Sequence, residues 1–252
     1  MGAVKLNEHQ NFDVGPHPHI GLSTLTYLFE GSIMHPDSLG SVVEIMPGDV
    51  NWMTAGEGIN HSERTPEYLR HSEKSMHGLQ IWVALPKELE QMKPEFFRIG
   101  KTEIPSWQNG SLNYKLIAGE AFGRKSPVPV YSKLYMVEIK TTSRETINIG
   151  EHLFGETGLY ILEGSIETEG NSYAAKQIPV AKEAKLCSLT MEAGTTIYIF
   201  GGEPFEEQRL IYWNFVATSK ELIENAKQKW IDQQFEKIPL ETGFVSLPLQ
   251  HS

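Results

Sequence analysis

The sequence predicts an all-β protein with two similar β domains, each a sandwich or barrel, and one helix near the C-terminus. Short apolar stretches separated by Gly, Pro, Asn or Asp recur about every eight to twelve residues between Ile20 and Phe215. A seven-residue motif also occurs twice, about half a chain length apart. Together these observations favour a duplicated β architecture.

Seven stretches are the clearest strand candidates. Many are rich in Val, Ile, Tyr, Phe and Thr, and none is long enough to favour a helix. They are Leu25–Phe29, Val42–Met46, Gln80–Ala84, Leu134–Ile139, Gly158–Leu162, Thr196–Phe200 and Leu210–Val216.

The C-terminal region contains a helical pattern. Leu222, Ala226 and Trp230 recur at four-residue intervals, and Thr218 and Glu221 have the spacing of a capping box. This pattern predicts an amphipathic helix over Lys220–Phe235. A second, short helix is predicted over Pro86–Met92.

The repeated motif predicts the domain division. Tyr27–Ile33 reads YLFEGSI and Tyr160–Ile166 reads YILEGSI, so that each copy is a strand followed by a Gly turn. Gly123–Pro129 lies between the copies and has the composition of a linker. We therefore expect one domain over residues 1–122 and a second over residues 123–252, with the terminal helix in the second.

Composition limits the partners and the compartment. The net charge of −10 disfavours direct binding to nucleic acid. The single cysteine, Cys187, excludes a disulfide framework and is expected to be an ordinary half-buried thiol in a reducing compartment. No apolar run reaches the ~18 residues that span a bilayer, and the N-terminal residues do not resemble a signal peptide. These features predict a cytoplasmic protein that does not bind membranes.

Two histidine motifs in the first half are candidate metal ligands. His17-Pro18-His19 places two imidazoles on one face of an extended segment, which Pro18 favours. His61-Ser62-Glu63 repeats this spacing with an imidazole and a carboxylate. On neighbouring strands the two motifs could present three nitrogens and one oxygen to a first-row transition metal, leaving two of six octahedral positions open.

Other interpretations of the histidines remain open. Either motif alone is more often a surface feature than a metal site. His77 precedes an apolar run and could support a metal ligand or have a structural role. His71 lies in a charged stretch and is expected to be solvated, and His35 shows no such partner pattern.

Three segments resemble the signature segments of the pirin family, part of the cupin superfamily. These are Gly15–Gly31, Pro47–Glu63 and His77–Pro86. The resemblance implies two cupin-type β-barrel (double-stranded β-helix) domains packed face to face. It also implies that the N-terminal domain holds one metal ion, Fe(II) in that family, through His17, His19, His61 and Glu63. Histidine and carboxylate ligands alone would also suit Mn, Co, Ni, Cu or Zn.

The resemblance implies two classes of function. Some pirin-like proteins are similar in activity to quercetin 2,3-dioxygenase, which opens the central ring of a flavonol with O₂. For this class we expect Glu63 to act as a general base in addition to binding the metal. Other pirins are non-catalytic, iron-dependent partners of transcription factors, and here such a role would need a protein partner because of the negative charge.

The chain departs from the family pattern at its start. Pirins usually carry a longer segment before the first motif, including strands that cover the first barrel. Here the residues before His17 show no convincing strand pattern, so we expect either that the chain starts late or that another segment or subunit completes the barrel.

The second domain is predicted to be free of metal. No histidine lies between His152 and His251, so the second copy cannot assemble three histidines. Aromatic and apolar side chains are expected to fill its interior instead, namely those of Tyr160, Leu162, Tyr198 and Phe200. The alternative is a second functional pocket around His152 and Glu156.

Overall fold

The computed structural model describes residues 2–182 and 188–248 and is built mostly of β-strands, with one α-helix. It divides into two compact units, the first comprising Met1–Lys101 with Glu206–Ser252 and the second comprising Thr102–Phe205. Residues 102–122 thus lie in the second unit and the terminal helix in the first. The domain division at residues 122 and 123 stays a prediction, as do closed barrels and their face-to-face packing.

The first unit contains a five-stranded sheet in the order β1-β8-β3-β6-β9. Its central strand β3 pairs antiparallel with both β8 and β6, and the three side chains Thr24, Thr26 and Leu28 share one face of the sheet. The strands are β1 (Val4–Leu6), β3 (Leu22–Glu30), β6 (Val50–Thr54), β8 (Lys74–Ala84) and β9 (Glu95–Ile99). Strand β1 lies in the segment before His17, where the sequence shows no convincing strand pattern.

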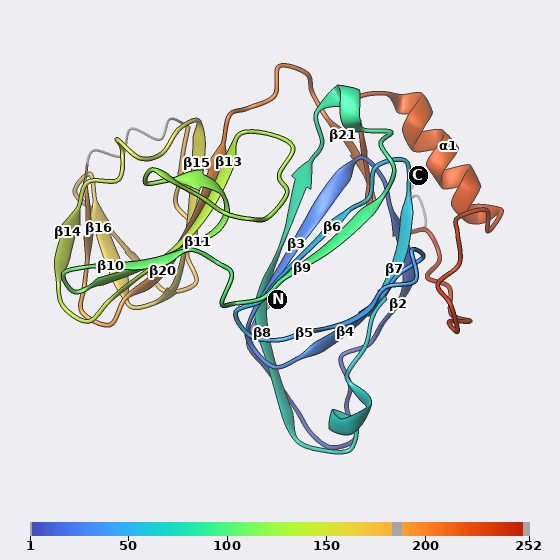
Figure 1. The fold of residues 1–252 in the computed structure, drawn as a ribbon, viewed down its shortest axis with the longest axis horizontal. Coiled ribbons are helices and arrows are strands. Elements are labelled where there is room, and N and C mark those ends of the chain that lie inside the picture. The colour runs from blue at the N-terminus through green and yellow to red at the C-terminus, as the bar shows by residue number, and fades with distance from the viewer. Residues whose placement is uncertain (1, 183–187, 249–252) are drawn as a thin grey trace. The chain divides into compact units, whose positions relative to one another are not determined.

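A second layer faces this sheet (Figure 1). Two antiparallel pairs, β2–β7 and β4–β5, are joined by isolated bridges between β4 and β7 and between Asp37 and His61. The strands are β2 (Val14–His19), β4 (Ile33–Pro36), β5 (Val42–Ile45) and β7 (Ile59–Glu63). All predicted metal ligands lie on β2 and β7.

C-terminal residues extend this second layer. Ile20, just after β2, forms a parallel bridge with Phe215 in the hairpin β21 (Leu210–Tyr212) and β22 (Phe215–Ala217). Helix α1 (Lys220–Ile231) buries Ile223, Ala226 and Trp230, and its Ile223 and Trp230 belong to the same apolar cluster as Ile20 and Phe215. Residues of the C-terminal region thus pack against the first β unit, and what completes its barrel stays a prediction.

The residues after α1 lie along the outer side of β2 and β7. The Arg64 guanidinium donates from Nε (2.8 Å) and Nη2 (2.6 Å) to the carboxylate of Glu241, which also accepts from the Ser62 hydroxyl at 2.8 Å. The backbone N–H of Val245 donates to the Pro16 carbonyl at 3.1 Å. Ser62 and Arg64 alternate with His61 and Glu63 along β7, so this C-terminal strap, residues 236–245, holds the strand from the side opposite the ligands.

The second unit has two sheets. One has the order β10-β11-β13-β20-β15-β18, with β12 paired to β11, and the other has the order β14-β19-β16-β17. The strands are β10 (Ser106–Asn109), β11 (Leu112–Ala121), β12 (Arg124–Lys125), β13 (Leu134–Thr141), β14 (Glu145–Ile147), β15 (Glu156–Glu163), β16 (Ser165–Thr168), β17 (Asn171–Ala174), β18 (Val180–Ala181), β19 (Leu189–Met191) and β20 (Thr196–Gly202).

The interior of the second unit is apolar, but its core cluster does not contain the predicted filling residues, of which Tyr198 is nevertheless buried. Its core cluster includes Leu159, Ile161, Ile197 and Ile199, whereas Tyr160, Leu162, Tyr198 and Phe200 are the alternate positions and are not part of it. Adjacent side chains of a strand point to opposite faces of the sheet. A prediction that assigns the wrong face to the interior therefore names every second residue instead of the residues that point inward. That this unit binds no metal stays a prediction.

The repeated motif forms the same local structure twice. Each copy is a strand, a glycine turn and a second strand, β3 to β4 in the first unit and β15 to β16 in the second. The turn residues Gly31 and Gly164 have positive φ angles of 88° and 76°. The predicted strand and glycine turn are therefore confirmed in both copies, and the structure adds a second strand after each turn.

Local corrections concern the C-terminal region and the short helix. The predicted strand Leu210–Val216 is a hairpin that turns at Trp213, where φ is +52°. Helix α1 ends at Ile231, and its N-cap is Ser219, because Thr218 instead hydrogen-bonds the buried carboxylate of Glu90. In place of the predicted short helix, the segment Pro86–Met92 contains only a 3₁₀ turn, Lys87–Leu89. A second 3₁₀ turn covers Glu67–Leu69.

Two expectations concern the compartment. Among the described residues no helix is long and apolar enough to cross a membrane. Cys187 lies outside the described residues, so its predicted half-buried setting stays a prediction.

Candidate metal centre

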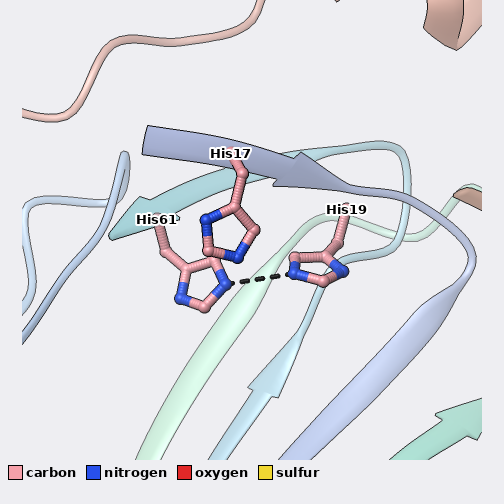
Figure 2. Close-up of side chains that lie close together, drawn as sticks. All are labelled: His17, His19 and His61. Atoms are coloured by element: carbon pink, nitrogen blue, oxygen red, sulfur yellow. Dashed lines mark hydrogen bonds between the residues drawn. The ribbon is translucent and has the colours of Figure 1, made fainter. Parts of the chain in front are cut away.

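Three histidine side chains converge between the two layers of the first unit. His17 and His19 come from β2 and His61 from β7, and β2 and β7 pair so that His17 lies directly opposite His61. One ligand nitrogen from each ring lies within 4.8 Å of the others, and Nε2 of His19 is 3.1 Å from Nε2 of His61 (Figure 2). Within residues 2–182 and 188–248 this is the one group of three metal-ligating side chains that meets this condition.

Alternation along the strands explains this convergence. Residues two apart on a strand share a face, and Pro18 keeps the backbone of the first motif extended between its two histidines. A β-bulge in β2 between Val14 and His17 shifts the register and brings His17 opposite His61. The prediction that the HxH and HxE motifs lie on neighbouring strands is confirmed.

Burial keeps the histidines neutral. It is the largest cause that lowers the pKa of all three, and for His19 and His61 the pKa lies well below the usual value of 6.5. The neighbouring imidazoles lower it further, because adjacent positive charges repel. Neutral imidazole is the form that binds metals, so the cluster is electrostatically suited to a cation.

Hydrogen bonds also orient the rings. Nδ1 of His17 donates to the Gly15 carbonyl at 2.8 Å, which leaves Nε2 of that ring as an acceptor. Nδ1 of His61 faces the ring of His35 at 3.3 Å, so its Nε2 is likewise directed at the cluster. Three converging nitrogen donors, of which those of His17 and His61 have their other nitrogen held by the protein, fit a first-row transition metal.

Glu63 lies beside this cluster but outside the group of converging ligand atoms. Its side chain is only 7% exposed and lies on the same face of β7 as His61. Its Oε1 accepts a hydrogen bond of 2.7 Å from Nε2 of Gln80 on the facing sheet. The structure therefore brings together three of the four predicted ligands, and the roles of Glu63 as ligand and base stay predictions.

Several residues around the cluster were not singled out from the sequence. His35 and Asp37 lie behind His61, Gln80 contacts Glu63, and the ring of Trp82 lies 5.4 Å from that of His19. His35 and Asp37 have the same two-residue spacing as the ligand motifs, which is the signal that could have identified them.

The remaining histidines have other environments. His77, one candidate for a residue that supports a ligand, packs edge-on against Phe29 with ring centroids 4.9 Å apart. His71 is exposed, as expected. In the second unit, His152 is exposed and packs against Phe122, beside a depression of about 460 Å³ that it lines with Glu151 and Arg124.

Two β units, one of which carries a histidine cluster on two paired strands, are the features of a cupin-class metal protein. Comparison with known families supports this class, since residues 1–83 match the model described as Pirin and residues 134–236 match the model of the pirin C-terminal cupin domain. The chain belongs to the pirin family.

Individual proteins are similar over most of the chain. A pirin-like protein of Caulobacter vibrioides is 46% identical over 238 residues, which cover 94% of this chain and 82% of that protein. A crystal structure of quercetin 2,3-dioxygenase from Acinetobacter baumannii has a TM-score of 0.86 and 34% identity, and covers 98% of this chain and 82% of its own. A second structure with that name and source has a TM-score of 0.83 and 26% identity, with 94% and 84% covered.

Proposed function

We propose that this chain is a metal-dependent dioxygenase that opens the ring of a flavonol-like aromatic substrate with O₂. The observation that carries the proposal is the convergence of three neutral imidazoles, two buried and that of His17 partly buried, beside the carboxylate of Glu63. Similarity to a structure named as quercetin 2,3-dioxygenase, at 34% identity, supports the same reaction class.

The metal would be held by His17, His19 and His61, with Glu63 as the fourth ligand. Fe(II) is the proposed ion, although the same donor set suits Mn, Co, Ni, Cu and Zn. When bound, the ion supplies Lewis-acid stabilisation for a deprotonated substrate oxygen.

Glu63 would also accept the proton of the substrate's 3-hydroxyl group. A general base must lie within hydrogen-bond reach of the proton that it removes, and Glu63 shares a strand face with His61. The hydrogen bond from Gln80 fixes one carboxylate oxygen and so restricts the rotation of the group. A base held in this way needs little reorganisation when the substrate binds.

The surroundings of the cluster suit a substrate that has both aromatic rings and hydroxyl groups. Trp82 is 41% exposed and offers an aromatic surface beside His19. Asn51 lies opposite Thr26 on the inner face of the sheet, is 3% exposed, and has no hydrogen-bond partner for either amide atom among the described residues. A buried amide of this kind gains by bonding a substrate hydroxyl or a water molecule.

The test is anaerobic reconstitution with Fe(II), followed by addition of a flavonol and O₂. We expect O₂-dependent loss of flavonol absorbance with release of carbon monoxide. His61→Ala should abolish this loss, whereas the exposed control His71→Ala should not. If the wild type binds iron but consumes no flavonol, the dioxygenase proposal is wrong, and the non-catalytic role with a protein partner is favoured.

A further inference from the structure

Behind the metal cluster, three buried polar side chains form a line that leads away from it. Nδ1 of His61 lies 3.3 Å from Nδ1 of His35, and Nε2 of His35 lies 3.3 Å from Oδ2 of Asp37. The three residues are only 1%, 4% and 0% exposed, respectively. The ring of Phe96 stacks on His35 at 4.6 Å and fixes the plane of the imidazole.

The carboxylate of Asp37 sets the direction of the hydrogen bonds. Its Oδ1 accepts from the backbone N–H groups of Leu39 (2.9 Å) and Ser41 (3.0 Å), and a bridge to His61 holds its backbone on β7. A carboxylate has no hydrogen to donate, so Oδ2 must accept from His35. In the form of the ring that carries a single N–H, that hydrogen is therefore on Nε2 of His35.

The same logic continues to the metal ligand. A neutral imidazole has one N–H, so Nδ1 of His35 is an acceptor and must receive the hydrogen of Nδ1 of His61. Nε2 of His61 then carries a free lone pair, and this is the nitrogen that faces His19 across 3.1 Å.

We propose that Asp37 and His35 are positioning residues that hold His61 in its metal-binding tautomer and orientation. Partners of this kind typically contribute 10- to 100-fold to metal affinity. The inference rests on the proposed metal site, but not on the dioxygenase reaction.

The decisive variant is Asp37→Asn, which keeps the shape of the side chain. Its amide oxygen can still accept from Leu39 and Ser41, which turns the NH₂ group toward His35. His35 must then accept at Nε2 and donate from Nδ1, which moves the proton of His61 onto Nε2. We expect the affinity for Co(II), measured anaerobically by visible absorbance against a competing chelator, to fall by about 10- to 100-fold.

A second readout does not depend on the metal. In the metal-free protein, ¹⁵N NMR of the histidine rings should show His61 protonated on Nδ1 in the wild type and on Nε2 in Asp37→Asn. If the two proteins share one tautomer, the inference is wrong even where the affinities differ.

Two further variants separate positioning from stability. His35→Gln can still donate to Asp37 and accept from His61, so it should retain Co(II) affinity within a few-fold of the wild type. Asp49→Asn changes another buried carboxylate, whose hydrogen-bond partners among the described residues are Arg98 and the backbone N–H of Lys101. It should lower the unfolding temperature without changing affinity.

The outcomes distinguish this inference from the proposed function. Equal losses of affinity in Asp37→Asn and Asp49→Asn, or wild-type affinity in Asp37→Asn, would overturn the positioning role. A wild-type protein that binds Co(II), shows the expected tautomers and yet consumes no flavonol with Fe(II) would support the positioning role and remove only the dioxygenase proposal.

Discussion

In the proposed function, Glu63 both binds the metal and accepts a proton. In Glu63→Gln an oxygen donor remains, but the negative charge and the proton acceptor are lost. We expect iron content to fall modestly, while flavonol turnover falls by roughly 10²-fold or more, the usual scale for loss of a general base. Metal analysis and turnover should be measured on the same samples, with the exposed residue in Glu57→Gln as the matched control. Equal losses of iron and turnover would reduce Glu63 to a ligand.

The sequence pointed to the three histidines that converge in the structure, but not to the residues behind them. His17, His19 and His61 are predictable because alternation along an extended strand places residues two apart on one face. His35 and Asp37 have the same spacing, but their function depends on β4 lying beside β7. That juxtaposition comes from tertiary packing, which local patterns do not encode.

At the scale of single elements, the turn between β3 and β4 tests whether Gly31 is required there because a neighbouring backbone approaches it closely. A Cβ on Gly31 would lie 2.2 Å from the carbonyl oxygen of Ser75, and φ there is +88°. Gly40 has almost the same φ, +87°, but nothing lies within 4 Å of its Cβ position. We expect Gly40→Ala to cost about 1 kcal/mol of unfolding free energy, from the backbone strain alone. Gly31→Ala should cost clearly more, about 3 kcal/mol or beyond, in denaturant titrations. Equal costs would show that the close approach of Ser75 does not matter.

The C-terminal strap is the second element with a testable role. In Glu241→Gln the carboxylate that accepts two hydrogen bonds from Arg64 loses its charge, and Arg64 directly follows the strand that carries His61. We expect a loss of about 1 kcal/mol in the free energy of unfolding, because the pair is only partly buried. Glu236→Gln is the control. Glu236 accepts a hydrogen bond from Asn60 through its backbone carbonyl, which the substitution leaves in place. The strap has no stabilising role if the two variants unfold alike.

Element prediction succeeded where the pattern was local and failed where distant contacts decided. The repeated motif correctly predicted a strand followed by a glycine turn in both units. The hairpin at Trp213 was missed because its turn uses a positive φ at a residue that usually favours strands. The helix cap shifted to Ser219 because a distant carboxylate, Glu90, binds Thr218.

The whole molecule should lose stability on acidification when it carries no metal. Burial lowers the pKa of His17, His19 and His61 below 6.5. In acid these histidines therefore bind protons more tightly in the unfolded chain than in the native state, which favours unfolding. This contribution to stability is complete above pH 6.5 and is lost as the pH falls below it. The loss is at most ~1.4 kcal/mol per pH unit for each histidine. Urea titrations with a chelator present should show this fall, and His61→Ala should make it shallower. A profile that is flat below pH 6.5 would contradict the pKa directions.

The arrangement of the chain was less predictable than its strands. Two β units could be inferred from the repeat, but the return of residues 206–248 to the first unit could not. This return depends on the apolar cluster that Phe215 and Trp230 form with Ile20, a residue far from them in the sequence.

Metal content per chain tests the central claim most directly. Elemental analysis of the purified protein, after reconstitution and removal of unbound ions, should give about one equivalent of transition metal per chain. His17→Ala combined with His19→Ala should bind none, and the exposed control His71→Ala should bind as the wild type does. Two equivalents in the wild type, or an undiminished equivalent in the double variant, would show that the three converging histidines are not the metal site.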